Sequence, residues 1–533
     1  MIDGNTLSTK STRYINALFI FLIVVYLLLG QILIWNIPYS FPFGGPDELM
    51  HLSMADYIAK YLSWPRWDSM EVVRNAYGVS YSAGGSIVYW LHGLSYKLFN
   101  HHRMGAFLLL LFYLVLTIMM YRKNRLVGFL LLAGFFPQTL FIFSYVNSDS
   151  GTIVTAVLLG MSVGVFVSGE AHIKSFLILF FFAGLAVTAR QHLWAIALIT
   201  LIWAVIYRRK DIYQYDKRIL VLAVFIALLP ASWWFITSYI ANDGDILGTF
   251  TTAKSIVNFG NPDLPSLARE WNDLSIGAFL YGTLVSLYAS WGWMTFGLGD
   301  REYMIIAVLG VFIAIVLYKN IEKKIFLFFI GLILINLGFM LLYSVAYDYQ
   351  AQGRYLFPSV YIILGVIATI LVKKRVFSKM LLFLLILFAV QNAYYSTKLT
   401  LFSYVETFME KPVLQKNIPE KYYTEAVFHL DELKTVDGKL FIRGWAFNRK
   451  TSKTFKKIEL ILKHDQIYYE VELKNEMRPD VAAAFKNNDL QYAGFSAEMV
   501  SLKQLHGSRY KYLFSIEVEG KTMLVDINKY LEL

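Results

Sequence analysis

The chain has 533 residues, of which 57% are hydrophobic, 17% are aromatic and only 16% are charged. This composition excludes a disordered chain and an ordinary soluble protein, and it indicates a polytopic membrane protein. The formal net charge is +11, but the basic residues gather in short clusters between apolar segments, which does not favour a nucleic-acid partner. The chain contains no cysteine, which excludes disulfides and thiolate metal sites and fits a bacterial envelope protein.

The first apolar segment, near residues 14–36, is too long for a signal-peptide core, so we expect a retained anchor. The loop after it carries Asp47, Glu48 and His51 at a membrane edge, where ionisable groups are expensive and usually functional. Pro46 suits the first turn of a helix, whose positive end would keep both carboxylates ionised, as a general base requires. On that helix Asp47 and His51 share a face, while Glu48 points elsewhere. A capped interfacial helix without chemistry is the alternative.

About eleven apolar runs are candidate membrane spans. They lie near 14–36, 104–121, 126–146, 151–168, 173–189, 192–207, 218–240, 302–318, 325–344, 354–372 and 379–397. The basic clusters at the ends of these runs, such as Arg208-Arg209-Lys210, all fall on the cytoplasmic side if the N-terminus is cytoplasmic. The loops at 37–103, 241–301 and 345–354, and everything after about residue 398, are then extracytoplasmic.

Two further apolar stretches, near 81–99 and 277–298, would break this charge pattern if either crossed the membrane. We therefore expect interfacial or re-entrant helices on the outer face. Their Trp and Tyr content, including Trp291 and Trp293, suits the headgroup zone, although aromatic belts also flank ordinary spans.

The C-terminal tail changes character from about residue 424, where apolar and polar residues alternate between turn signals. Strand-like runs occur at Ile458–Leu462, Ile467–Leu473 and Tyr512–Val518. The length of the tail suits one small β-sandwich. We therefore expect a membrane domain over 1–400, a linker over 401–423 and an extracytoplasmic β-sandwich over 424–533.

Another outer-face motif is Gln352-Gly353-Arg354-Tyr355, at the start of a late span. An arginine in that position must be paired, solvated or bound to an anion. The functional interpretation is a phosphate clamp, because guanidinium donors match phosphate oxygens bidentately, and Gly353 would let a ligand approach the backbone. The alternative is an arginine paired with Asp348 or a lipid headgroup.

Two tight outer hairpins are also polar. Asn147 and Asp149 form either a binding hairpin or a polar turn in which Asp149 caps the next helix. Arg190 and His192 either bind a ligand or pair structurally, since polar groups there are costly without partners. A pair of histidines at 101–102 has no third ligand at useful spacing, and no phosphate-binding nucleotide loop is present in the sequence.

Taken in order, the Pro46-Asp47-Glu48 loop with His51, the Asn147–Asp149 hairpin and the Gln352–Tyr355 motif resemble one bacterial membrane family. That family, long catalogued as a domain of unknown function, belongs with the GT-C-fold glycosyltransferases, and the resemblance covers roughly residues 10–400. It implies a mainly α, polytopic, GT-C-like membrane fold, to which this chain adds the C-terminal all-β domain. Gly444-Trp445-Ala446-Phe447 and Arg478-Pro479-Asp480-Val481 resemble small modules attached to bacterial surface-glycan enzymes, so a glycan-binding role rests on analogy.

The resemblance implies an undecaprenyl-phosphate sugar donor, a cell-envelope glycan acceptor and a reaction outside the bacterial cytoplasmic membrane. It implies Asp47 as the base, with Glu48 as the alternative, and Arg354 at the donor phosphate with Gln352 and Tyr355 beside it. The other implied substrate-binding residues are His51, Asn147, Asp149, Arg190 and His192. No cofactor is expected; a divalent cation is possible, but no convincing ligand set is visible. A flippase of lipid-linked sugars and a surface polysaccharide polymerase remain alternative functions.

Overall fold

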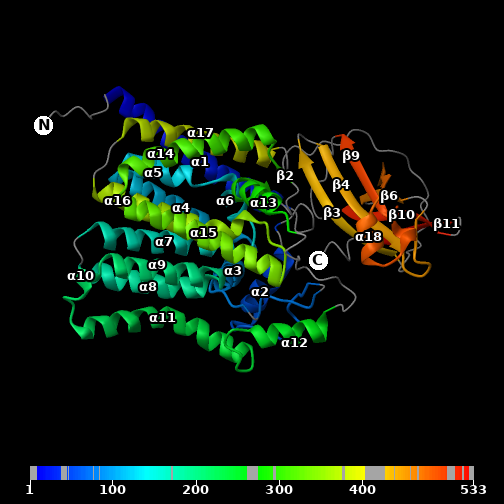
Figure 1. The fold of residues 1–533 in the computed structure, drawn as a ribbon, viewed down its shortest axis with the longest axis horizontal. Helices are drawn as coiled ribbons and strands as arrows, with labels where there is room; N and C mark the ends of the chain where they lie inside the picture. Colours follow the sequence, from blue (N-terminus) through cyan, green and yellow to red (C-terminus); the bar gives the residue numbers. More distant parts are fainter. Residues whose placement is uncertain are drawn as a thin grey trace. The chain divides into compact units, whose positions relative to one another are not determined.

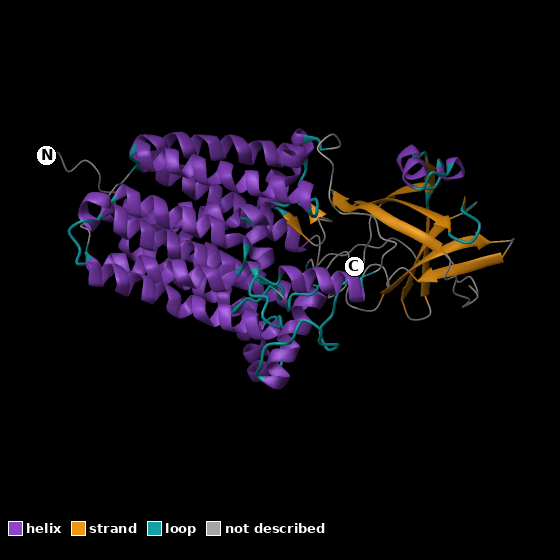
Figure 2. Cartoon of the chain, turned by 60° about the horizontal axis from the view of Figure 1, so that its bottom comes forward, coloured by secondary structure: helices purple, strands orange, loops and turns teal. Residues whose placement is uncertain are grey.

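The computed structural model describes residues 9–37, 45, 47–75, 77–82, 84–169, 172–260, 274–291, 296–374, 378–401, 426–436, 439–455, 458–464, 467–500, 510–518 and 521–526. The chain divides into two compact units (Figure 1). The first comprises Met1–Ile34, Asp47–Ala289 and Arg301–Thr397, and it is helical. The second comprises Trp35–Pro46, Ser290–Asp300 and Lys398–Leu533, and it holds the strands (Figure 2).

Within the described residues, eight helices are long and apolar enough to cross a membrane. They are α1 (Thr9–Asn36), α4 (Met104–Lys123), α7 (Asp149–Ser168), α11 (Lys217–Ala241), α14 (Asp300–Asn320), α15 (Lys323–Ala346), α16 (Phe357–Lys373) together with the 3₁₀ turn before it from Gly353, and α17 (Lys379–Thr400). Two shorter apolar helices, α8 (Ile173–Ala189) and α9 (His192–Tyr207), coincide with two further predicted spans. The expectation of a mainly α, multi-pass membrane protein is confirmed.

The span expected over 126–146 is wrong as a continuous helix. The chain forms α5 (Arg125–Ala133), breaks, and resumes as α6 (Pro137–Ile142). Proline lacks a backbone N–H and disfavours helical geometry at the residue before it. Phe136 is accordingly extended, with φ −64° and ψ 159°.

Helices α7 and α16 pack at very short range. A Cβ added at Gly160 of α7 would lie 2.1 Å from the carbonyl oxygen of Ile362, and one added at Gly365 of α16 would lie 2.4 Å from that of Val157. Small residues let membrane helices approach backbone to backbone in this way. Because α7 begins at Asp149 and α16 begins at Phe357, directly after the short turn that holds Arg354, this contact helps to fix the spacing of two candidate site residues.

The helices of the loops that the charge pattern predicts to be extracytoplasmic gather at one end of the bundle (Figure 1). They are α2 (Glu48–Tyr61), α3 (Val88–Phe99), α12 (Thr249–Phe259) and α13 (Ile276–Tyr288), whereas the basic α10 (Arg209–Ile212) lies at the opposite end. These ends are the ones that the charge pattern assigns to opposite sides of the membrane. The expectation of a helix over 277–298 is wrong beyond Tyr288, because Ser290–Trp291 form the strand β1; Trp293 lies outside the described residues.

The second unit contains two sheets. One has the order β1-β2-β3-β4-β9-β8, with β5 paired to β4, and the other has the order β11-β10-β6-β7. Their bounds are β1 (Ser290–Trp291), β2 (Phe296–Gly297), β3 (Ala426–Val436), β4 (Lys439–Asn448), β5 (Lys453–Thr454), β6 (Ile458–His464), β7 (Ile467–Glu472), β8 (Lys474–Glu476), β9 (Gly494–Val500), β10 (Tyr510–Val518) and β11 (Lys521–Asp526). The three predicted strands are confirmed as β6, β7 and β10. The parallel pairing of β2 with β3 was not expected from the sequence, and the expected linker lies, apart from residue 401, outside the described residues.

The residues that resemble surface-glycan modules lie partly in the interior of this unit and partly on its surface. Phe447 and Val481 belong to one buried cluster, and Trp445 packs against it beside the short helix α18 (Pro479–Ala484). The guanidinium of Arg478 pairs with Asp480, at 2.7 Å between Nη2 and Oδ2, and also with Asp431. These contacts give the motif residues a role in holding the domain together.

Candidate functional site

Asp47 stands immediately before α2 rather than inside its first turn. Its backbone is left-handed, with φ 58°, and its side chain makes no capping bond to the helix. The carboxylate instead accepts a hydrogen bond from the Tyr81 hydroxyl at 3.1 Å, and its Oδ2 lies 3.9 Å from Nη2 of Arg354. The side chain is 21% exposed. Asp47 therefore offers a partly accessible carboxylate next to a guanidinium. The proline expected in the first turn, Pro46, lies outside the described residues.

Glu48 is fully buried and is held by Arg103. Nε and Nη2 of Arg103 lie 2.7 and 2.8 Å from the two carboxylate oxygens, and the backbone N–H of Val146 donates to Oε1 at 3.1 Å. A carboxylate enclosed in this way lacks the solvent access of its neighbour. Between the two acids considered for the base, the geometry favours Asp47. The sequence analysis missed Arg103, whose signal was an isolated arginine directly before the span at 104.

Three distant segments bring two arginines to one carboxylate. Asp149 is the first residue of α7, Arg190 follows α8, and Arg354 lies in the short 3₁₀ helix η2 (Gly353–Leu356). Arg190 donates to Oδ1 of Asp149, and Nη1 of Arg354 lies 3.9 Å from Oδ2 of the same carboxylate. Burial would lower the pKa of Arg190, but the Asp149 charge outweighs it and raises that pKa, so the guanidinium stays charged.

Tyr355 and His192 complete the surroundings of the two arginines. The Tyr355 ring centroid lies 5.3 Å from Arg354 and 5.7 Å from Arg190, within cation–π range. The His192 ring meets Tyr355 edge-on, with the centroids 5.6 Å apart. The Tyr355 ring therefore lies within cation–π range of both guanidinium groups.

The backbone N–H of His51 donates to the Asp47 carbonyl oxygen at 3.1 Å, whereas the imidazole is connected to the Asp47 carboxylate through Tyr81. The His51 ring stacks on Tyr81 with centroids 4.1 Å apart, and its Nδ1 is hydrogen-bonded to the Tyr89 hydroxyl. Burial, followed by the charge of Arg190, lowers the pKa of His51 well below its usual value, so the ring is neutral. The neutral imidazole therefore supports the tyrosine that donates to Asp47.

Two of the candidate residues have local structural contacts. The Asn147 side chain accepts from the Ser150 N–H at 2.8 Å and donates to the carbonyl oxygens of Ile142 and Tyr145, which builds the hairpin. Gln352 is half-buried, and its carbonyl accepts the N–H of Tyr355 at 3.1 Å. These contacts account for the shape of both loops.

The expectation that Gly353 opens the backbone to a ligand is wrong. A Cβ at Gly353 would lie 2.1 Å from the backbone nitrogen of Leu287, and the Gly353 N–H donates to the Ser286 hydroxyl at 2.6 Å. The glycine is needed because α13 lies against η2, and this contact places Arg354.

The cluster also contains buried polar atoms without a hydrogen-bond partner. They are Nε of Arg354, Nε2 of His192 and Oδ2 of Asp149. Buried polar groups are normally satisfied, and an unpaired one is costly. A guanidinium N–H beside a second guanidinium matches the oxygens of a phosphate group. The arrangement can therefore bind a phosphate next to the carboxylate of Asp47.

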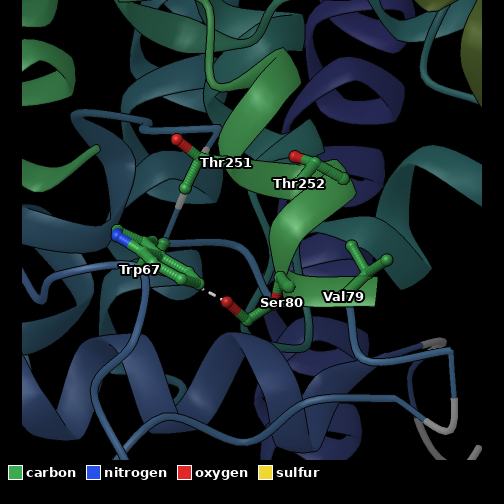
Figure 3. Close-up of a pocket in the computed structure, with 7 residues that line it drawn as sticks. Trp67, Val79, Ser80, Thr251 and Thr252 are labelled. Carbon is green, nitrogen blue, oxygen red and sulfur yellow. Dashed lines mark hydrogen bonds between the residues drawn. The ribbon is translucent and has the colours of Figure 1, made fainter. Parts of the chain in front are cut away.

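The neighbours of Tyr81 line a shallow polar pocket (Figure 3). Trp67, Ser80 and Ser82 are among its lining residues. The hydroxyls of the two serines are hydrogen-bonded to each other at 2.6 Å. None of its lining residues is charged, so this pocket offers a phosphate hydroxyl donors but no positive charge. Among the described residues, no group of three His, Asp or Glu side chains is placed to hold a metal ion.

Comparison with known proteins gives no match among curated proteins. Two crystal structures of ArnT from Cupriavidus metallidurans are similar in fold, one in the apo state and one bound to undecaprenyl phosphate. Both are 16% identical to this chain, with TM-scores of 0.40 and 0.41 and with 69% and 70% of this chain covered. The aligned part of each comprises 61% of the ArnT chain, about three fifths of its length.

The family comparison matches residues 102–363, which include α4, the Asn147–Asp149 hairpin, Arg190 and the Arg354 motif. The matching family is described as "Predicted membrane protein (DUF2142)". The similarity to this family therefore covers just under half of the 533-residue chain.

Proposed function

We propose that this protein is a membrane glycosyltransferase that moves a monosaccharide from an undecaprenyl-phosphate carrier to an exported cell-envelope glycan. The observation that carries the proposal is the 3.9 Å approach of Arg354 to the partly exposed carboxylate of Asp47. It places a general base beside a group suited to a leaving phosphate, at the outer-loop end of a membrane bundle.

The arginines bind the sugar donor. The prenyl chain lies among the spans, and its phosphate is bound by Arg354 and Arg190. The unpartnered Nε–H of Arg354 supplies a further donor. Charge accumulates on the phosphate as the bond from the anomeric carbon to the phosphate oxygen breaks, so these contacts strengthen in the transition state.

Asp47 activates the acceptor. Its carboxylate takes the proton of an acceptor hydroxyl while that oxygen attacks the anomeric carbon from the face opposite the phosphate. One carbon–oxygen bond forms, one breaks, and the lipid phosphate leaves with the electron pair. This single displacement inverts the anomeric configuration. Tyr81, stacked on His51, orients the carboxylate through its hydrogen bond.

The cellular arrangement follows from the charge pattern. We infer an enzyme in the bacterial cytoplasmic membrane with a cytoplasmic N-terminus and an extracytoplasmic active site. The acceptor is a polysaccharide, a teichoic acid or a lipid-linked glycan. The β-domain holds this polymer near the site and raises its effective concentration; a passive cap over the outer face is the alternative. Deleting residues after 424 should reduce polymer modification more than donor binding, whereas equal losses favour the cap.

The test uses the full chain purified into lipid nanodiscs. The protein is incubated with a set of undecaprenyl-phosphate monosaccharides and candidate envelope glycans, and the products are analysed by mass spectrometry. Transfer of one sugar with inversion supports the proposal. Growth of a polymer indicates a polymerase, and movement of the donor across proteoliposomes without transfer indicates a flippase; either result refutes the proposal.

A further inference from the structure

The structure assigns Glu48 and Arg103 a positioning role: we propose that their buried ion pair sets the place of Asp47 relative to the arginine cluster. This inference rests on the proposed function, because it concerns the base of that reaction. Neither residue is proposed to touch a substrate. Each acts through the backbone segments that it joins.

The pair connects segments that are distant in sequence. Arg103 stands directly before α4 and donates from Nη1 to the carbonyl oxygen of Ile34, at the outer end of α1, at 3.1 Å. Its other donors form the two-point contact with Glu48, the first residue of α2. Glu48 in turn accepts the N–H of Val146, in the loop before α7. The ends of α1, α2, α4 and α7 are thereby fixed around one guanidinium.

The backbone of Asp47 needs such an anchor. Aspartate tolerates the left-handed region better than most residues, but a non-glycine residue there still costs free energy that its surroundings must offset. Asp47 has φ 58° and gives α2 no side-chain cap. The residue that follows it is locked by two hydrogen bonds to a side chain that is only 1% exposed. The Glu48 anchor therefore holds Asp47 in a conformation that turns its carboxylate to Tyr81 and Arg354.

The same pair reaches the other half of the site. Val146 lies three residues before Asp149, which binds both arginines. The Asn147 between them is fixed by the His92 ring, whose Nε2–H donates to its carbonyl oxygen at 3.0 Å. One ion pair therefore links the loop of the base to the loop that orients Arg190 and Arg354. Bidentate geometry matters here, because a single-point contact would leave the two loops free to rotate.

The experiment compares Arg103→Lys and the double variant Glu48→Gln/Arg103→Met with wild type in nanodiscs. The first keeps the charge but loses the fork, and the second removes both charges, so that no buried charge is left unpaired. Glu71→Gln is the matched control, since Glu71 pairs at the exposed surface with Lys60 of α2, the helix that begins at Glu48. Thermal unfolding, kcat and the KM for the donor are measured for each variant.

For variants that unfold at the wild-type temperature, we expect kcat to fall about 10²-fold, the effect of a misplacement near 1 Å. The donor KM should change much less than kcat, because Arg190 and Arg354 keep their own contacts with Asp149. Glu71→Gln should match wild type in both. A stable variant with wild-type kcat would overturn the positioning role.

A second readout is independent of transfer. The chain contains no cysteine, so Asp47→Cys introduces a single thiol whose rate of reaction with a water-soluble reagent reports its position. Adding Arg103→Lys should change that rate at least severalfold. An unchanged rate would overturn the proposal. If the lysine variant does not fold, Glu48→Asp, which keeps the charge and shortens the anchor by one methylene, replaces it. A wild-type protein without transfer refutes the proposed function alone, because the thiol rate still tests the pair.

Discussion

Replacing Asp47 by asparagine is the most direct test of the proposed base. Asparagine has the same shape as aspartate and tolerates the left-handed backbone that residue 47 adopts. Its amide oxygen can still accept the Tyr81 hydroxyl, which donates to Asp47 at 3.1 Å. The change therefore removes the proton acceptor and leaves the local geometry in place.

The expected loss can be estimated from the geometry. The contact with Arg354 is 3.9 Å long and joins a carboxylate that is 21% exposed to an arginine that is 8% exposed. Because Arg354 keeps Asp149 as a partner, the loss of stability should be about 1–2 kcal/mol, less than for a buried pair that is fully broken. A positioned general base contributes about 10²–10⁴-fold to the rate. This corresponds to about 3–5 kcal/mol in the activation barrier. Activity should therefore collapse while the unfolding temperature stays near that of wild type.

The assay is single-turnover transfer from an undecaprenyl-phosphate sugar at saturating acceptor, with unfolding followed in the same nanodiscs. Asp56→Asn is the matched control, because Asp56 lies on α2, the helix that follows Asp47, and pairs with the part-exposed His102 at 3.1 Å. That control should transfer at the wild-type rate. A folded Asp47→Asn protein with near-wild-type transfer would refute the assignment of Asp47 as the base.

Three further predictions concern the arginines and a buried histidine. Arg354→Lys keeps the charge but loses the fork, so kcat/KM for the donor should fall about tenfold or more; an unchanged value contradicts a phosphate role. Arg190→Gln leaves Asp149, which is 2% exposed, without its hydrogen-bonded partner and should lower unfolding stability by about 3–5 kcal/mol, measured by thermal denaturation, whereas no loss contradicts the pairing. Burial lowers the pKa of His92 to about 4, so the unfolded chain protonates first as the pH falls below about 6.5, and stability should decline by about 3 kcal/mol between pH 6.5 and 4. His92→Gln should flatten that pH dependence, and an unaltered profile would contradict it.

Much of the membrane architecture is readable from the sequence. A span is a continuous apolar run, and its length and composition are local properties. The strands of the tail are likewise local, since alternation and turn signals mark them before any partner is known. The exception at 126–146 has a local cause as well: Pro137 breaks the helix, and the apolar composition masks that break.

The sequence by itself also identified most of the candidate site residues, because ionisable groups at a membrane edge are rare and cost free energy. It placed Asp47 ahead of Glu48 as the base but kept Glu48 as the alternative, and it missed Arg103. Only the tertiary structure separates the two acids: one is sealed against an arginine 55 residues away, and the other is partly exposed beside Arg354. The structure also shows that Gly353 lacks a side chain because α13 packs against it, and not to let a ligand approach. The reason is that burial and pairing across long separations depend on how helices pack, which no local pattern of residues encodes.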